Sequence, residues 1–138
     1  MAGAAIVIGV GARAGLGAAL CRRFASEGLH VFVAGRTAER IGAVASDIEA
    51  SGGCATPVVA DATSPADVAA LFDAAVDAGS PPVVAVYNAG NNRFRPLLDM
   101  DDAFFEDLWR LCCFGGFLFG SMGITTFTDP SNYGLSLT

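Results

Sequence analysis

The sequence predicts an α/β domain in which a parallel sheet carries helices on both of its faces. Apolar runs of strand length alternate with longer stretches whose apolar residues recur at helical spacing, and glycine, proline or helix-capping residues separate them. The first apolar run, residues 4–10, shows no polar alternation, which is typical of a strand buried on both faces of a parallel sheet. With 138 residues, the chain has room for one domain of ordinary size and not for two.

Local signals locate the individual elements. Pro57 favours an edge position for the third strand, because proline cannot donate to a strand ladder. The helix that follows has the clearest start, since Ser64 is a capping residue, Pro65 suits the first helical position and Asp67 adds an acid to the first turn. Thr37 is the expected cap of the preceding helix. The expected strands are residues 4–10, 29–34, 54–60 and 83–87, and the expected helices follow Gly15, Thr37, Ser64 and Asp101 or Asp102.

The stretch from Gly9 to Gly17 joins the first strand to the first helix, and four of its nine residues are glycine. A strand that turns into a helix within a few residues needs backbone angles that side chains disfavour. A pyrophosphate can approach the start of a helix only where no Cβ intervenes, and there it meets free N–H groups and the positive end of the helix dipole. The stretch therefore predicts a dinucleotide site, with a tight turn that binds nothing as the alternative.

Composition and charge exclude several other classes of function. The net charge of −6 argues against binding of nucleic acid through a basic surface. The four cysteines show no CxxC spacing and the single histidine, His30, cannot complete a metal site with them, so we expect no metal. Free thiols suit a reducing compartment, and we expect a cytoplasmic protein.

Three short motifs stand at the ends of three expected strands. They are Gly11, Gly15 and Gly17 after the first strand, Asp61 after the third, and Asn88-Ala89-Gly90 after the fourth. Taken singly, Asp61 and Asn88-Ala89-Gly90 each have an alternative as an ordinary turn. Together, and in this order, the motifs resemble the short-chain dehydrogenases/reductases over roughly residues 4–120. We therefore expect a Rossmann-like doubly wound parallel sheet in the order 3-2-1-4, with the switch point between strands 1 and 4.

The resemblance also implies contacts with a cofactor. In the family, an aspartate at the position of Asp61 contacts the adenine. An NAD-selecting site carries Asp or Glu at the end of the second strand, where this chain has Gly35 followed by Arg36. A guanidinium can grip a 2′-phosphate, and Arg13 in the glycine turn offers a second positive charge, so we expect NADP in preference to NAD. An Arg36 that points into water is the alternative. The expected cofactor-binding residues are Gly11, Arg13, Gly15, Leu16, Arg36, Asp61, Asn88, Ala89 and Gly90.

The catalytic residues of the resembled family are missing from these 138 residues. Its members use Asn, Ser, Tyr and Lys, with Tyr as acid/base and Lys lowering the pKa of that Tyr. Cys112 stands at the position of the Asn, and no Tyr-x-x-x-Lys occurs. We therefore assign no catalytic residue and expect the chain to be inactive alone. Cys112 is expected to be a buried helix cysteine, because no histidine lies downstream to support a thiolate nucleophile.

The last part of the chain departs from the family pattern. Residues 121–138 match neither the rest of the last helix nor a fifth strand, so we expect a domain at 1–120, truncated before the fifth strand, and an atypical tail at 121–138. Residues 111–128 form an uncharged stretch of 18 residues, which is nominally long enough to span a membrane. Five of these eighteen residues are glycine or serine, and a periodic helix leads into them, so we expect no membrane insertion.

Three interpretations of the whole chain stay open. The first is part of a reductase that binds NADP without transferring hydride, and the second is a non-catalytic module that binds a nucleotide or a partner. The third is a chain that does not persist as a folded monomer. Residues 83–86 and the last helix are apolar on surfaces that we expect to associate with a second copy or another protein. No substrate follows from these residues, because in the resembled family the other half of the chain builds the substrate pocket.

Overall fold

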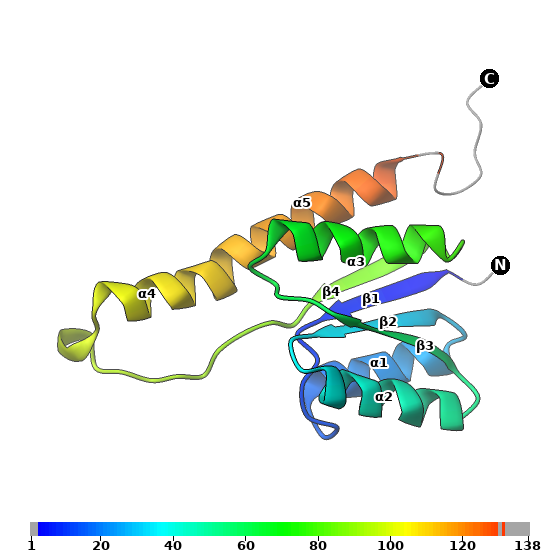
Figure 1. Ribbon diagram of the computed structural model, residues 1–138, viewed down its shortest axis with the longest axis horizontal. Coiled ribbons are helices and arrows are strands. Elements are labelled where there is room, and N and C mark those ends of the chain that lie inside the picture. The colour runs from blue at the N-terminus through cyan, green and yellow to red at the C-terminus, as the bar shows by residue number, and fades with distance from the viewer. Residues whose placement is uncertain (1–2, 130, 132–138) are drawn as a thin grey trace.

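A computed structural model of the chain describes residues 3–129 and 131, and it shows the expected parallel sheet (Figure 1). All pairings in the sheet are parallel, and the order β3-β2-β1-β4 confirms the predicted order 3-2-1-4. Pro57 lies in an edge strand as predicted, because β3 pairs only with β2 in the described sheet. The strands are β1 (Ala4–Ile8), β2 (His30–Gly35), β3 (Cys54–Val59) and β4 (Pro82–Tyr87).

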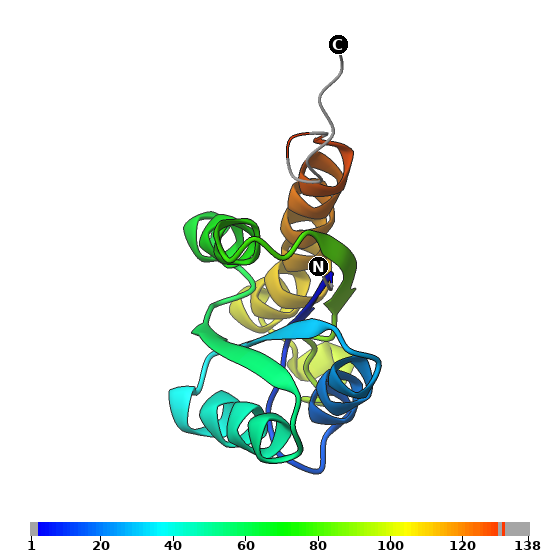
Figure 2. The same ribbon diagram turned by 90° about the vertical axis from the view of Figure 1, so that its right-hand side faces the viewer.

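Helices cover both faces of the sheet, as Figures 1 and 2 show. Helices α1 (Leu16–Ser26) and α2 (Ala38–Ala50) lie on one face, and α3 (Pro65–Asp77) and α5 (Gly115–Thr128) lie on the other. The central strand β1 serves two cores because its successive side chains point to opposite faces. Ile6 and Ile8 belong to the core under α3 and α5, whereas Ala5 and Val7 belong to the core under α1 and α2.

The starts of α2 and α3 differ in a way that bears on the site. Ser64 caps α3 as predicted, since its Oγ accepts a hydrogen bond of 3.3 Å from the backbone N–H of Asp67. Thr37 is the residue before α2, but its side chain makes no capping hydrogen bond. The Thr37 hydroxyl is therefore not engaged at the start of the helix.

A long helical segment follows β4 and runs away from the sheet at its beginning. Asp101 caps α4 (Asp102–Trp109) by accepting a hydrogen bond of 2.8 Å from the backbone N–H of Phe104. A turn of π-helix, η2 (Arg110–Phe114), connects α4 to α5. Helix α5 returns to the sheet, whereas α4 projects beyond it together with the preceding loop and its short helix η1 (Leu97–Asp99) (Figure 1).

The expectation that the helical pattern ends at Gly120 is wrong, because α5 continues to Thr128. The hydroxyls of its Thr residues donate to carbonyls one turn back, as Thr125 does to Ser121 (3.1 Å) and Thr126 to Met122 (2.9 Å), so these polar groups have partners within the helix. Asp129 and Ser131 follow the helix, and the remaining residues of the expected tail lie outside the described residues.

By length and composition alone, the continuous helix over residues 102–128 could cross a membrane, because its most apolar stretch of 18 residues has a mean hydropathy of 1.4; 22% of that stretch is buried in the fold. The core helix of a soluble fold can have the same composition. Here α5 packs against α3 and β4, and the Phe119 ring lies 5.1 Å from the ring of Phe72. The apolar side chains on this face of α5 therefore have a place in the core of the domain.

Candidate functional site

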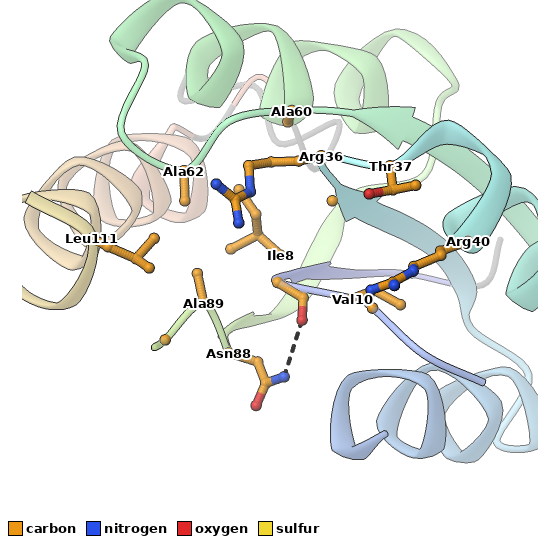
Figure 3. Close-up of a pocket in the computed structure, with 14 residues that line it drawn as sticks. Ile8, Val10, Arg36, Thr37, Arg40, Ala60, Ala62, Asn88, Ala89 and Leu111 are labelled. Carbon is orange, nitrogen blue, oxygen red and sulfur yellow. Dashed lines mark hydrogen bonds between the residues drawn. The ribbon is translucent and has the colours of Figure 1, made fainter. Parts of the chain in front are cut away.

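The carboxyl ends of β1 and β4 meet in direct backbone contact. The backbone N–H of Asn88 donates to the carbonyl of Ile8 (2.9 Å), and its side-chain Nδ2 donates to the carbonyl of Gly9 (3.2 Å), shown as a dashed line in Figure 3. Gly9 has φ +89°, and a Cβ there would overlap the backbone of Asn88 and Ala89. Glycine at this position therefore lets the two strand ends close on each other.

A cavity opens beside this contact (Figure 3). Its walls come from the carboxyl ends of all four strands and from the long helix, which contributes Leu111. In open parallel sheets, ligands bind outside the carboxyl ends of the strands, at the point where the strand order reverses. The lining residues are 8–11, 35–37, 40, 60, 62, 88–90 and 111.

Two glycines of the cavity wall have open space where a side chain would begin. A Cβ added to Gly11 or to Gly90 would meet no atom within 4 Å, and neither residue has a positive φ. The folding of the chain therefore does not require glycine at these two positions. Both residues line the cavity, so the absence of a side chain leaves their backbone open there, and together they form a cradle that suits a closely approaching ligand.

The charged side chains that line this cavity are two arginines, Arg36 and Arg40, and its lining residues include no acid. The position before Arg36 cannot carry the carboxylate of an NAD-selecting site, because a Cβ on Gly35 would overlap the carbonyl oxygen of Val10. That same Cβ would also lie 3.0 Å from Cγ2 of Ile41. Packing between β1, β2 and α2 therefore enforces the small residue at the end of β2.

Asp61 lines a second cavity that shares Arg36, Gly90 and Leu111 with the first. Its Oδ1 accepts hydrogen bonds of 2.8 Å from both the backbone N–H and the hydroxyl of Thr63. These two bonds hold the pKa of Asp61 below its usual value, and the bond from the backbone N–H has the larger effect. The carboxylate is therefore kept ionised and fixed in orientation next to the first cavity.

The structure brings together six of the nine residues predicted to bind the cofactor. Five of them line the first cavity and Asp61 lines the second; the five are Gly11, Arg36, Asn88, Ala89 and Gly90. Gly15 and Leu16 lie at the start of α1 and line neither cavity. Arg13 also lines neither, because its guanidinium is paired with Asp47 of α2.

Several cavity residues were not predicted from the sequence, among them Thr37, Arg40 and Leu111. Arg40 follows Thr37 by three positions, so it belongs to the first turn of α2, and this spacing was an available signal. Leu111 is separated from the other motifs by twenty residues or more and carries no motif of its own. Only the path of the long helix brings it to the cavity.

The π-helical turn that presents Leu111 is held by Tyr87, the last residue of β4. The Tyr87 hydroxyl donates to the carbonyl of Leu111, and burial raises the pKa of this tyrosine. A Cβ on Gly115 would overlap the same hydroxyl.

The expectation that Cys112 is buried is wrong, because its thiol is exposed. Cys112 belongs to η2, which precedes the part of the helix that packs on the sheet.

The glycine turn at the switch point and the cradle beside it define a class of protein, the doubly wound dinucleotide-binding domains. The model of one family, described as short chain dehydrogenase, matches residues 5–132. The chain belongs to the short-chain dehydrogenase/reductase family, whose members bind NAD(P).

Two curated relatives illustrate the similarity. A hydroxy-methyl-oxo-hexahydro-indene-carboxyl-CoA reductase of Mycobacterium tuberculosis is 36% identical over 101 residues, which cover 72% of this chain and 38% of the reductase. The 3beta-hydroxysteroid dehydrogenase 1 of Eggerthella lenta is 42% identical over 86 residues, covering 61% of this chain and 33% of that enzyme. The chain thus spans well under half the length of these relatives.

Solved structures agree in fold. A hydroxysteroid dehydrogenase from Escherichia coli superposes with a TM-score of 0.83 and 30% identity, covering 90% of this chain and 52% of that one. An actinorhodin polyketide ketoreductase, solved with NADPH, superposes with a TM-score of 0.85 and 25% identity, covering 98% of this chain and 51% of that one. The described fold therefore corresponds to about half of a solved family member.

Proposed function

We propose that this chain binds NADP(H) in the two adjoining cavities and represents the cofactor-binding part of a short-chain oxidoreductase. The observation that carries the proposal is the cradle of Gly11 and Gly90, where neither packing nor backbone conformation requires glycine. The dinucleotide would lie along the carboxyl ends of the strands, with its pyrophosphate at the start of α1, near Gly15 and Leu16. Asp61, Asn88 and Ala89 complete the proposed contacts.

The preference for NADP over NAD rests on charge. Arg36 lines both cavities, and the packing of Gly35 against Val10 leaves no room for a carboxylate at the end of β2. A guanidinium forms charge-assisted hydrogen bonds with a phosphate, whereas the 2′-hydroxyl of NAD offers it no charge. The ketoreductase that superposes on this chain was solved with NADPH, which supports the same choice of cofactor.

We expect the purified chain to bind NADPH more tightly than NADH by about tenfold, and Arg36→Ala to remove most of that difference. Fluorescence titration with each dinucleotide measures both affinities. Arg23→Ala is a matched control, because Arg23 is exposed on α1 and pairs with Glu27 of the same helix. Equal affinities of the wild-type chain for NADPH and NADH would contradict the NADP preference.

We also propose that these 138 residues alone do not transfer hydride between NADP(H) and a carbonyl or alcohol. Reduction of a carbonyl needs a positioned proton donor, and the Ser, Tyr and Lys that serve the family are not in this sequence. With NADPH and a panel of ketones and aldehydes, we expect no oxidation above a protein-free blank. The actinorhodin polyketide ketoreductase, which was solved with NADPH, is the positive control, and turnover by this chain would disprove the proposal.

A second candidate function is partner binding through α4. A hollow on this helix is lined by Leu97, Met100, Phe105 and Trp109, with Asp101, Asp102 and Glu106 among its polar residues; we refer to it as the α4 hollow. Phe105 is 61% exposed and Trp109 is 45% exposed, and contiguous exposed apolar side chains of this kind often mark an interaction site. The outer edge of β4 is also unpaired in the described sheet.

We expect the chain to associate with itself at tens of micromolar, and Phe105→Glu with Trp109→Glu to weaken that association severalfold by charging the α4 hollow. Sedimentation velocity measures the change. Phe94→Glu is the control, since Phe94 is 92% exposed and lies outside the hollow. A monodisperse wild-type monomer would rule out self-association through these surfaces.

A further inference from the structure

Arg13 contacts two neighbouring helices, one through its side chain and the other through its backbone. Its Nε donates to Oδ2 of Asp47 in α2 at 2.9 Å, and its NH2 group donates to Oδ1 of the same carboxylate. Its backbone carbonyl accepts a hydrogen bond of 2.9 Å from the guanidinium of Arg22 in α1. A single exposed ion pair contributes little, but a bidentate pair within a small network has the geometry that does contribute.

These contacts hold the glycine turn from outside the cavity. Arg13 lies between Gly11 and Gly15, so the pair with Asp47 connects the middle of the turn to α2. The turn itself closes through one hydrogen bond of 2.8 Å, from the backbone N–H of Gly15 to the carbonyl of Ala12. The position of Gly11 in the cavity wall therefore depends on a short loop that Asn88 holds at Gly9 and that Arg13 anchors to α2.

Arg40 lines the first cavity, whereas Arg13 does not. It lies there beside Arg36 and Thr37, and no ion pair between described residues involves it. In Figure 3 the side chains of Arg36 and Arg40 extend toward the cavity from the end of β2 and the first turn of α2. Because no acid lines this cavity, its two guanidiniums give it a positive charge inside a chain of net charge −6.

We propose that the two arginines have distinct roles: Arg40, with Arg36, contacts the phosphate on the adenosine ribose of NADP(H), and Arg13 is a positioning residue that holds the glycine turn through Asp47. The proposal rests on the proposed function, because it assigns residues to the cofactor of that same site. It differs from the expectation from sequence, in which Arg13 supplied the second positive charge of the phosphate site.

The two roles give opposite results when Asp47 is removed. If Arg13 anchors the turn, then Asp47→Ala loosens the turn. The affinities for NADPH and for NADH then fall by the same factor, about twofold to fivefold. If Arg13 instead contacted the phosphate, Asp47 would compete with that phosphate, and Asp47→Ala would strengthen NADPH binding alone. Arg40→Ala is expected to lower the affinity for NADPH by about tenfold and to leave the affinity for NADH unchanged.

The experiment is a titration of the full chain and its variants with NADPH and with NADH. The variants are Arg13→Ala, Arg40→Ala, Asp47→Ala and the charge swap Arg13→Asp with Asp47→Arg. Circular dichroism before each titration identifies variants that fail to fold, and Arg23→Ala controls for the loss of one guanidinium from α1. The swap is expected to restore the affinity for both dinucleotides, since it restores the ion pair and not a positive charge at Arg13.

The assignment would be overturned if Arg13→Ala lost the preference for NADPH over NADH. It would also be overturned if Arg40→Ala kept that preference. A gain in NADPH affinity in Asp47→Ala would overturn it as well. These outcomes are separate from failure of the proposed function, which would appear in the wild-type chain as equal affinities for NADPH and NADH or as no binding of either.

Discussion

Replacement of Gly9 with alanine is expected to lower the free energy of unfolding by about 3 kcal/mol or more. Gly9 has φ +89°, a conformation that costs an alanine energy on its own. A Cβ at this position would also lie 2.6 Å from Cα of Ala89, an atom of backbone that cannot move aside without shifting β4. Equilibrium unfolding in urea, followed by circular dichroism, measures the loss.

Gly28→Ala is the matched control for this substitution. Gly28 has φ +86°, nearly the same backbone conformation, but a Cβ there would meet no atom within 4 Å. We expect it to cost about 1 kcal/mol, the conformational part alone. If both variants lost the same free energy of unfolding, the close contact between Gly9 and the end of β4 would make no separate contribution to stability.

Replacement of Phe72 with alanine is expected to cost about 3–5 kcal/mol of unfolding free energy. The Phe72 ring is 1% exposed and lies between the sheet and α5, with its centroid 5.1 Å from that of Phe119. Its removal leaves a cavity at the junction of β1, α3 and α5 that the surrounding backbone can close only partly. Against a typical domain stability of about 5–15 kcal/mol, this loss brings the chain close to unfolding at 25 °C.

Phe94→Ala removes the same side chain from a position that is 92% exposed. We expect a change within about 0.5 kcal/mol, because no packed contacts are lost. Urea unfolding of both variants in the same buffer gives the comparison. A Phe72→Ala variant as stable as Phe94→Ala would mean that α5 does not rest on α3 in solution.

The sheet and its order were predictable from the sequence because they depend on local patterns and one topological rule. Residues 4–8 are apolar without alternation, and this pattern identifies a strand that is buried on both faces of a parallel sheet. Ser64, Pro65 and Asp67 define the start of α3 through contacts within one turn. The glycine turn then requires β1 beside β4, which fixes the order of the remaining strands.

The features that were missed depend on contacts between distant residues or on weak local patterns. The pair of Arg13 with Asp47 joins residues 34 positions apart, and no local pattern indicates such a partner. The continuation of α5 beyond Gly120 was missed because residues 121–128 lack a clear apolar stripe and contain residues with low helix propensity. The exposure of Cys112 depends on where the helix first touches the sheet, which is a tertiary feature.

The position of β1 has a consequence for isotope exchange with the solvent. All five of its residues are at most 1% exposed, and β2 and β4 flank it on its two sides, whereas β3 and β4 each have one neighbour in the described sheet. In deuterated water, amides of β3 and β4 can exchange when an edge strand detaches locally. Amides of β1 that donate to β2 keep their acceptors during such an event, so their exchange rate in the native protein reports the free energy of unfolding of the whole domain.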